Sequence, residues 1–335
     1  MKILLASDGS TSATNAVDTV SSLALPAGTE ILLVAVLGAA PDLFGSAWES
    51  YVPADAEAIE RQMVDELKAA LDGLKARLER PGVVVRSEVL RGRAATRVVE
   101  ESNVLGADLI VVGSRGLGGW KRLLLGSVSA EIVDHATCPV LVARRPAVRS
   151  VILADDGSVG ARSAAALLTR LPALAGSGVK VVAVAEVLNA AALGFSPAVS
   201  GAFMTEMIES TAESEARLAA ATVETAAILK AAGIDAETLV LSGDPAHEIV
   251  RLARASDTDL ILVGTAGLTG VARAVLGSVA RNVLINARSS VLVVHQPVEP
   301  GVAADDVDDV YDAEGHEVRD TASEAFLIAE DQRLE

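Results

Sequence analysis

The chain contains one sequence unit written twice. The segment at 3–10, ILLASDGS, returns at 151–158 as VILADDGS, 148 residues later. Further along, LGSV at 125–128 returns at 276–279, now 151 residues later, so one small insertion separates the copies. Because each copy is long enough to form its own core, the 335 residues predict two tandem domains of the same fold.

We place the first domain at residues 1–146 and the second at 147–296. The remaining residues, 297–335, contain thirteen acidic side chains against two arginines. A segment of this composition buries too little apolar surface to fold alone. We therefore expect an acidic, disordered tail there.

Each copy alternates apolar runs with amphipathic segments, which predicts alternating strands and helices. Continuous runs such as 109–112 and 260–263 are typical of parallel strands that are buried on both faces. The predicted fold class is α/β, with two tandem doubly wound domains, each a five-stranded parallel sheet with helices on both faces. The expected strands are 2–8, 30–37, 83–90, 108–113 and 139–143, then 150–155, 180–187, 235–241, 259–264 and 290–295. The expected helices of the first copy are 11–24, 54–80, 94–105 and 127–136.

Charge and composition exclude several classes of partner. The formal charge is −17, but the tail carries eleven of these net negative charges and leaves −6 on residues 1–298. Without a basic excess, nucleic acid is not an expected partner. The single cysteine, Cys138, excludes an internal disulfide and a multi-cysteine metal site. The apolar run at 31–40 is too short to cross a bilayer and no signal peptide is evident, so we expect a cytoplasmic protein without a membrane partner.

A glycine-rich motif follows the fourth expected strand of each copy. It has the form Gly-x2-Gly-x9-Gly-Ser, beginning at Gly113 and again at Gly264. A strand ends, a flexible segment follows, and a helix begins whose free N–H groups and dipole favour an anion. Glycines also let the backbone approach a ligand closely. The alternative is that these residues are turn glycines and N-cap serines, but the identical spacing in two copies favours an anion site.

An aspartate ends the first expected strand of each copy, Asp8 and Asp156. At the carboxyl edge of a parallel sheet such a side chain can accept hydrogen bonds from ribose hydroxyls or help to hold a metal. The alternative role is to cap the helix that follows Gly9. The two roles can coexist.

These motifs, together with the closing segment 138–142 (CPVLV), resemble the universal stress protein family in its tandem-domain form. The resemblance covers residues 1–296, and the loop motif is specific to the ATP-binding branch of that family. It implies a strand order of 3-2-1-4-5 in each domain, with ATP held across the carboxyl ends of the strands. Family members associate through their last strand, which implies that the two halves form a pseudo-dimer.

The resemblance also implies the residues that contact the nucleotide. In the first half, the backbone near Ala6 and Val36 would contact adenine, and Asp8 the ribose. The implied ribose and phosphate contacts are Gly113, Ser114, Arg115, Gly116, Gly119, Arg122, Gly126, Ser127, Val128 and Ser129. The corresponding residues of the second half are Ala154, Asp156, Gly264, Thr265, Gly267, Gly270, Arg273, Gly277, Ser278 and Val279. The implied cofactor is ATP with Mg²⁺.

The two copies differ in charge at the expected sites. The first loop carries Arg115 and Lys121 where the second carries Ala266 and Ala272. We therefore expect both sites to be usable, with the first binding a triphosphate more tightly.

A second difference concerns the expected adenine contact. Val36 aligns with Glu186, or with Val187 if the register slips by one residue. Asp155 also adds a negative charge beside Asp156. The sequence therefore leaves the adenine contact of the second half open between Glu186 and Val187.

The leading hypothesis is a cytoplasmic ATP-binding stress protein in which nucleotide occupancy regulates conformation or the binding of a regulatory protein, with a homodimer as a further assembly. One alternative is a slow ATPase or a nucleotidyl- or phosphoryl-transfer enzyme that uses Asp8 or Asp156 with Mg²⁺. The other is a structural pairing module that binds no nucleotide. The sequence contains no Gly-x4-Gly-Lys-Ser/Thr, Gly-x-Ser-x-Gly or Gly-x-Gly-x-x-Gly motif, which argues against fast catalysis, and we assign no catalytic residue and no metal site.

Overall fold

The computed structural model describes residues 1–38, 56–115, 125–171, 177–186, 201–265 and 276–295, without the side chains of residues 56 and 201–209. These residues belong to one compact unit, Met1–Pro297. The tail predicted for residues 297–335 lies outside the described residues, so its disorder stays a prediction. The domain limits that we placed at residues 146 and 296 also remain predictions.

The first half alternates strands and helices as its sequence predicts. Its elements are β1 (Lys2–Ala6), α1 (Thr11–Ser22), β2 (Thr29–Leu37), α4 (Ala56–Leu78), β3 (Val83–Arg91), α5 (Ala94–Leu105), β4 (Leu109–Gly113), α6 (Ser127–His135) and β5 (Val140–Ala143). Helix α1 begins where the Ser10 hydroxyl accepts a hydrogen bond from the N–H of Ala13 at 3.2 Å. This cap satisfies one of the four helix N–H groups that lack an intrahelical partner.

The second half repeats the same order. Its elements are β6 (Ser150–Ala154), α7 (Val159–Thr169), β7 (Gly178–Ala185), α8 (Gly201–Ala231), β8 (Ala236–Ser242), α9 (Pro245–Ala255), β9 (Leu260–Gly264), α10 (Ser278–Asn286) and β10 (Ser290–Val294). Ser158 caps α7 by accepting from the N–H of Ala161 at 3.2 Å, as Ser10 does in the first half. The repeated sequence therefore produces a repeated local structure.

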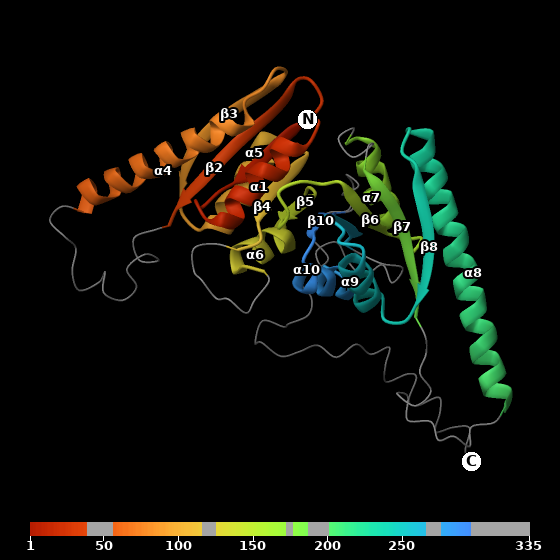
Figure 1. Cartoon of the computed structure of the whole chain (residues 1–335). Coiled ribbons are helices and arrows are strands. Elements are labelled where there is room, and N and C mark those ends of the chain that lie inside the picture. Colours follow the sequence, from red (N-terminus) through yellow and green to blue (C-terminus); the bar gives the residue numbers. More distant parts are fainter. Residues whose placement is uncertain (39–55, 116–124, 172–176, 187–200, 266–275, 296–335) are drawn as a thin grey trace, which may run out of the picture. The chain divides into compact units, whose positions relative to one another are not determined.

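The strands form one sheet of ten, in the order β3-β2-β1-β4-β5-β10-β9-β6-β7-β8 (Figure 1). Each half shows the expected order 3-2-1-4-5, with parallel neighbours. The two five-stranded sheets are joined because β10 pairs antiparallel with β5, which confirms the pseudo-dimer. Since the junction is antiparallel, the carboxyl ends of the strands in one half lie at the opposite edge of the sheet from those in the other.

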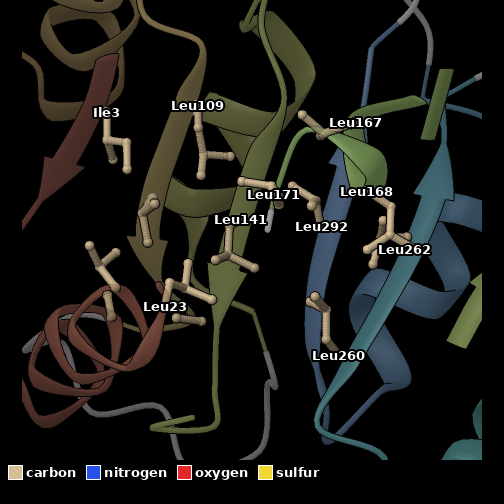
Figure 2. Packing of buried hydrophobic residues seen from close by; sticks show 14 of the residues in the cluster. Ile3, Leu23, Leu109, Leu141, Leu167, Leu168, Leu171, Leu260, Leu262 and Leu292 are labelled. Atoms are coloured by element: carbon tan, nitrogen blue, oxygen red, sulfur yellow. The ribbon is translucent and has the colours of Figure 1, made fainter. Parts of the chain in front are cut away.

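Helices cover both faces of this sheet. Helices α1, α4, α7 and α8 pack on one face, and α5, α6, α9 and α10 on the other. The core on the first face runs through the junction, where Leu141 of β5 and Leu292 of β10 are both buried in it (Figure 2). Because both faces are covered, the strands need apolar residues at successive positions, which explains their continuous apolar runs.

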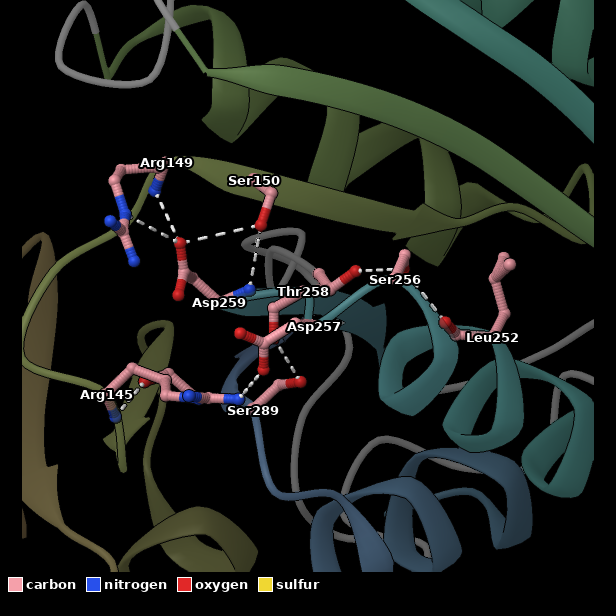
Figure 3. A network of polar contacts seen from close by, with 10 residues as sticks. Arg145, Arg149, Ser150, Leu252, Ser256, Asp257, Thr258, Asp259 and Ser289 are labelled. Carbon is pink, nitrogen blue, oxygen red and sulfur yellow. Dashed lines mark hydrogen bonds and ion pairs between the residues drawn. The ribbon is translucent and has the colours of Figure 1, made fainter.

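Polar contacts hold the connection between the halves to the second half (Figure 3). The buried carboxylate of Asp259 accepts from the N–H of Arg149 through Oδ2 at 3.0 Å. In return, the N–H of Asp259 donates to Oγ of Ser150 at 3.0 Å, and Arg145 forms an ion pair with Asp257. These contacts fix the start of β6 against β9.

None of the helices in the described ranges combines the length and the apolar character that a membrane span requires.

Candidate functional site

The first strand of the first half ends in a tight turn that carries Asp8. Oδ1 of Asp8 accepts from the N–H of Ser10 at 3.0 Å, and Oγ of Ser7 accepts from the N–H of Gly9 at 3.3 Å. Gly9 has a φ of 77°, which a glycine adopts without strain. The N-cap of α1 is Ser10, so the alternative in which Asp8 itself caps the helix is wrong. Asp8 is instead an exposed carboxylate, oriented by the turn at the carboxyl edge of the sheet.

The second half forms the same turn with one chemical change. Oδ1 of Asp156 accepts from the N–H of Ser158 at 2.9 Å, as Asp8 does in the first half. Asp155 occupies the position of Ser7, is only 3% exposed, and accepts from the N–H of Gly157 at 2.8 Å through Oδ1. Its Oδ2 has no hydrogen-bond partner among the described residues. This half therefore has a buried negative charge beside the turn.

The two ends of each glycine loop are tied together. In the first half, the N–H of Gly126 donates to the carbonyl of Ser114 at 2.7 Å, and in the second, the N–H of Gly277 donates to that of Thr265 at 2.6 Å. The hydroxyl of Ser10 also donates to the carbonyl of Arg115 at 3.1 Å. The start of the first loop is therefore fixed against the turn that carries Asp8.

Close packing supplies a separate reason for three of the loop glycines. A Cβ on Gly113 would lie 2.6 Å from the carbonyl carbon of Ser12, and one on Gly264 would lie 2.7 Å from that of Gly160. A Cβ on Gly277 would lie 2.9 Å from the carbonyl oxygen of Thr265. Real Cβ atoms do not approach other atoms this closely, so these positions require glycine whether or not a ligand binds.

Helices α6 and α10 begin without a side-chain cap, unlike α1 and α7. Their N-cap residues are Gly126 and Gly277. Ser127 and Ser278, the first residues of the helices, are exposed. First-turn N–H groups and an exposed hydroxyl at a helix N-terminus can bind an anion.

Ser129 does not present its hydroxyl as a ligand-contacting group. It is buried, and Oγ donates to the carbonyl of Gly113 at 2.7 Å. The second half has Ala280 at this position, which is also buried. Ser129 thus fixes the start of α6 against the end of β4, and its predicted ligand contact could involve only its backbone.

The pairing of the strands corrects the expected adenine contact in the second half. Ala6 pairs with Val34, and Ala154 with Val182. Val36, two residues beyond Val34, therefore corresponds to Val184. Both valines are partly buried against the core on the same face of the sheet. The alignments of Val36 with Glu186 or Val187 were wrong, because the insertion that shifts the two copies lies beyond this strand.

Several predicted contacts lie outside the described residues. They are Gly116, Gly119 and Arg122 in the first half, and Gly267, Gly270 and Arg273 in the second. Val128 is exposed beside Ser127, and Val279 is partly buried against the core. No group of three His, Cys, Asp or Glu side chains able to hold a metal occurs in the described ranges.

Sequence reasoning missed Arg144, which follows β5. Arg144 is partly buried, and this burial together with the nearby charge of Arg115 lowers its pKa to about 10. It therefore lies within electrostatic reach of the first loop. The sequence feature that could have indicated Arg144 is its position directly after the last strand of its half, where the second half has His295.

Comparisons with known proteins agree for both halves. Residues 1–144 and 147–295 each match the model of the universal stress protein family. A universal stress protein of Methanocaldococcus jannaschii is 33% identical over 145 residues, which are 43% of this chain and 82% of the relative. One of Mycobacterium tuberculosis H37Rv is 30% identical over 224 residues, covering 63% of this chain and 69% of the relative. The crystal structure of a universal stress protein from Archaeoglobus fulgidus covers 88% of this chain and 98% of its own, with a TM-score of 0.59 and 18% identity. At that identity the likeness concerns the fold.

Proposed function

Since the chain belongs to the universal stress protein family, we propose that it binds ATP at the carboxyl edge of each half, and that occupancy regulates its conformation or its binding to a partner protein in the cytoplasm. The observation that carries the proposal is the loop beside Asp8. Its ends are joined by the Gly126–Ser114 hydrogen bond, and its start is held to the Asp8 turn through Ser10. In the second half the Gly277–Thr265 hydrogen bond joins the two ends of the loop in the same way.

The groups along this edge match the parts of a nucleotide. Ala6 and Val36 offer a partly buried apolar surface for a base. The carboxylate of Asp8 is an acceptor for ribose hydroxyls. The uncapped start of α6, with Ser127, supplies donors for phosphate oxygens.

Mg²⁺ would enter this site with the nucleotide. The described residues offer a turn carboxylate in each half, Asp8 and Asp156, and no group of three or more side chains able to hold a metal. Mg²⁺ commonly keeps several waters and is held by one or two carboxylates together with substrate phosphates. In that role it would neutralise phosphate charge, while Asp8 or Asp156 would supply an oxygen ligand or a water contact.

We expect the two sites to differ in affinity. The first loop carries Arg115, and the second loop carries Ala266 at the corresponding position. Asp155 adds a buried negative charge to the second half, where Ser7 is neutral. Both differences favour a polyphosphate in the first half.

The test is an ATP titration of variants of the turn aspartates. Asp8→Asn keeps an oxygen for the N–H of Ser10 and replaces the other carboxylate oxygen with a donor. Loss of one charge-assisted hydrogen bond predicts an affinity about tenfold weaker at the first site. Asp18→Asn is the matched control, because Asp18 lies on α1 and pairs with Arg77. Unchanged ATP affinity in the double variant Asp8→Asn, Asp156→Asn would contradict the proposal.

A further inference from the structure

Two equivalent residues cross the junction between the halves. Arg144 follows β5 and donates through Nη2 to the carbonyl of Leu284 on α10 at 2.6 Å. His295 follows β10, and its Nε2 lies 2.9 Å from the carbonyl of Val133 on α6. Because a carbonyl only accepts, His295 donates from Nε2. Each half therefore holds a helix of the other.

The helices held in this way are the two that begin at the proposed phosphate sites. Helix α6 starts at Ser127, and the contact with His295 lies at Val133, six residues or about 9 Å along the helix from the first site. Helix α10 starts at Ser278 and receives Arg144 near its other end. A third contact links the helices directly, since Arg281 pairs with Asp134 at 2.8 Å.

The crossing residues are also attached to the loops of their own halves. The N–H of Ser114 donates to the carbonyl of Ala143 at 3.2 Å, one residue before Arg144. The N–H of Thr265 donates to the carbonyl of Val294 at 3.1 Å, one residue before His295. A continuous chain of contacts therefore runs from the start of each loop, through Arg144 or His295, to the helix of the opposite site.

We propose that the two nucleotide sites are coupled through α6 and α10, with Arg144 and His295 as the positioning residues that connect the loop of one site to the helix of the other. The inference rests on the proposed nucleotide binding and adds its regulation. Coupling of this kind requires that occupancy of one site change the stability of the helix at the other.

Charge makes the two connections unequal. Arg144 is partly buried, and both this burial and the charge of Arg115 disfavour its protonated form. A phosphate bound beside Arg115 would offset this repulsion and strengthen the hold of Arg144 on α10. At His295 burial lowers the pKa, so this ring is neutral at neutral pH. We therefore expect nucleotide binding at the first site to stabilise α10 more than nucleotide binding at the second site stabilises α6.

Hydrogen exchange of the full chain, with Mg²⁺-ATP as the probe, tests the coupling. Asp156→Asn weakens the second site, so that ATP occupies the first. ATP should then slow exchange at the start of α6 and, by about two- to tenfold, in α10 (residues 278–286). Arg144→Ala should abolish the slowing of exchange in α10 and leave the slowing in α6. Arg144→His places at this position the residue type that His295 has in the second half, and it should reduce the slowing in α10.

Arg145→Ala is the matched control, because this neighbouring cation pairs with Asp257 and should leave the response of α10 intact. Slowed exchange in α6 with no change in α10, or an α10 response that persists in Arg144→Ala, would overturn the coupling. If ATP does not bind and α6 does not respond, the proposed function fails first. Hydrogen exchange without ATP then still tests the contacts of Arg144 with α10 and of His295 with α6. Arg144→Ala should speed exchange in α10, and His295→Ala should speed exchange in α6.

Discussion

Ser7 and Asp155 occupy the same position at the ends of β1 and β6, and each accepts a hydrogen bond from the glycine N–H two residues later. The distances are 3.3 Å from Gly9 and 2.8 Å from Gly157. A serine hydroxyl therefore performs the same structural task as the carboxylate. Asp155 has in addition a buried Oδ2 with no partner among the described residues. Burying this second oxygen without a hydrogen bond destabilises the folded chain, and Ser7 has no such atom.

We expect Asp155→Ser to stabilise the protein, because it keeps the turn and removes the buried charge. The expected gain in the free energy of unfolding is about 1–3 kcal/mol, measured by urea denaturation. The reverse change, Ser7→Asp, should destabilise it. A loss of stability in Asp155→Ser would show that Oδ2 has a donor or cation partner in the intact chain.

Gly113→Ala should destabilise the protein by about 1–3 kcal/mol, because its Cβ would overlap the backbone of Ser12. Gly73→Ala is the control, since Gly73 lies within α4 and an added Cβ meets nothing within 4 Å. Alanine favours a helix over glycine by about 1 kcal/mol, so this variant should gain stability. Equal thermal unfolding of the two variants would refute the packing reason given for Gly113.

His295 makes stability depend on pH. Burial lowers its pKa below the ordinary 6.5, against the opposing effects of the carbonyl of Val133, the backbone of Cys138 and the carboxylate of Asp134, which pairs with Arg281. Below pH 6.5 the unfolded chain therefore binds a proton that the folded chain does not, and stability falls as the pH falls.

His295→Gln should flatten this part of the profile, because glutamine offers a donor to Val133 and does not titrate. Urea denaturation at several values between pH 7.5 and 5 measures the difference between the two proteins. An equal loss of stability in both over this range would exclude His295 as its source.

Cys138 should react slowly in the folded chain. Burial raises the pKa of its thiol to about 11 from an ordinary 9.0, so its thiolate fraction is about a hundredfold below that of an ordinary thiol. Iodoacetamide labelling at pH 8, followed by mass spectrometry, measures the rate. The same reaction in urea is the control, and equal rates in the two conditions would contradict the prediction.

Much of the fold could be predicted from local sequence. The apolar runs of β4 and β9 indicated buried parallel strands, and the repeated motifs indicated two copies of one unit. The predicted limits of α6, 127–136, differ by one residue from Ser127–His135. These features depend on neighbours in the chain, which is why the sequence carries them.

Contacts between distant segments could not be predicted in this way. Val184 became the counterpart of Val36 only through strand pairing, because the position of the insertion is ambiguous in the sequence. The contact of Arg144 with Leu284 depends on the antiparallel junction and joins residues 140 positions apart. The motif at Gly113 had two possible reasons, and the packing against Ser12 became evident only in three dimensions.

The most direct test of the central claim is the number of ATP molecules bound per chain. Purified protein would be unfolded, freed of any bound small molecule, refolded and dialysed to equilibrium against labelled Mg²⁺-ATP. The account predicts saturation at one to two ATP per chain, with the first equivalent weakened by Asp8→Asn and unaffected by Asp18→Asn. No bound ATP at millimolar concentration, in a chain whose circular dichroism shows it to be folded, would contradict it.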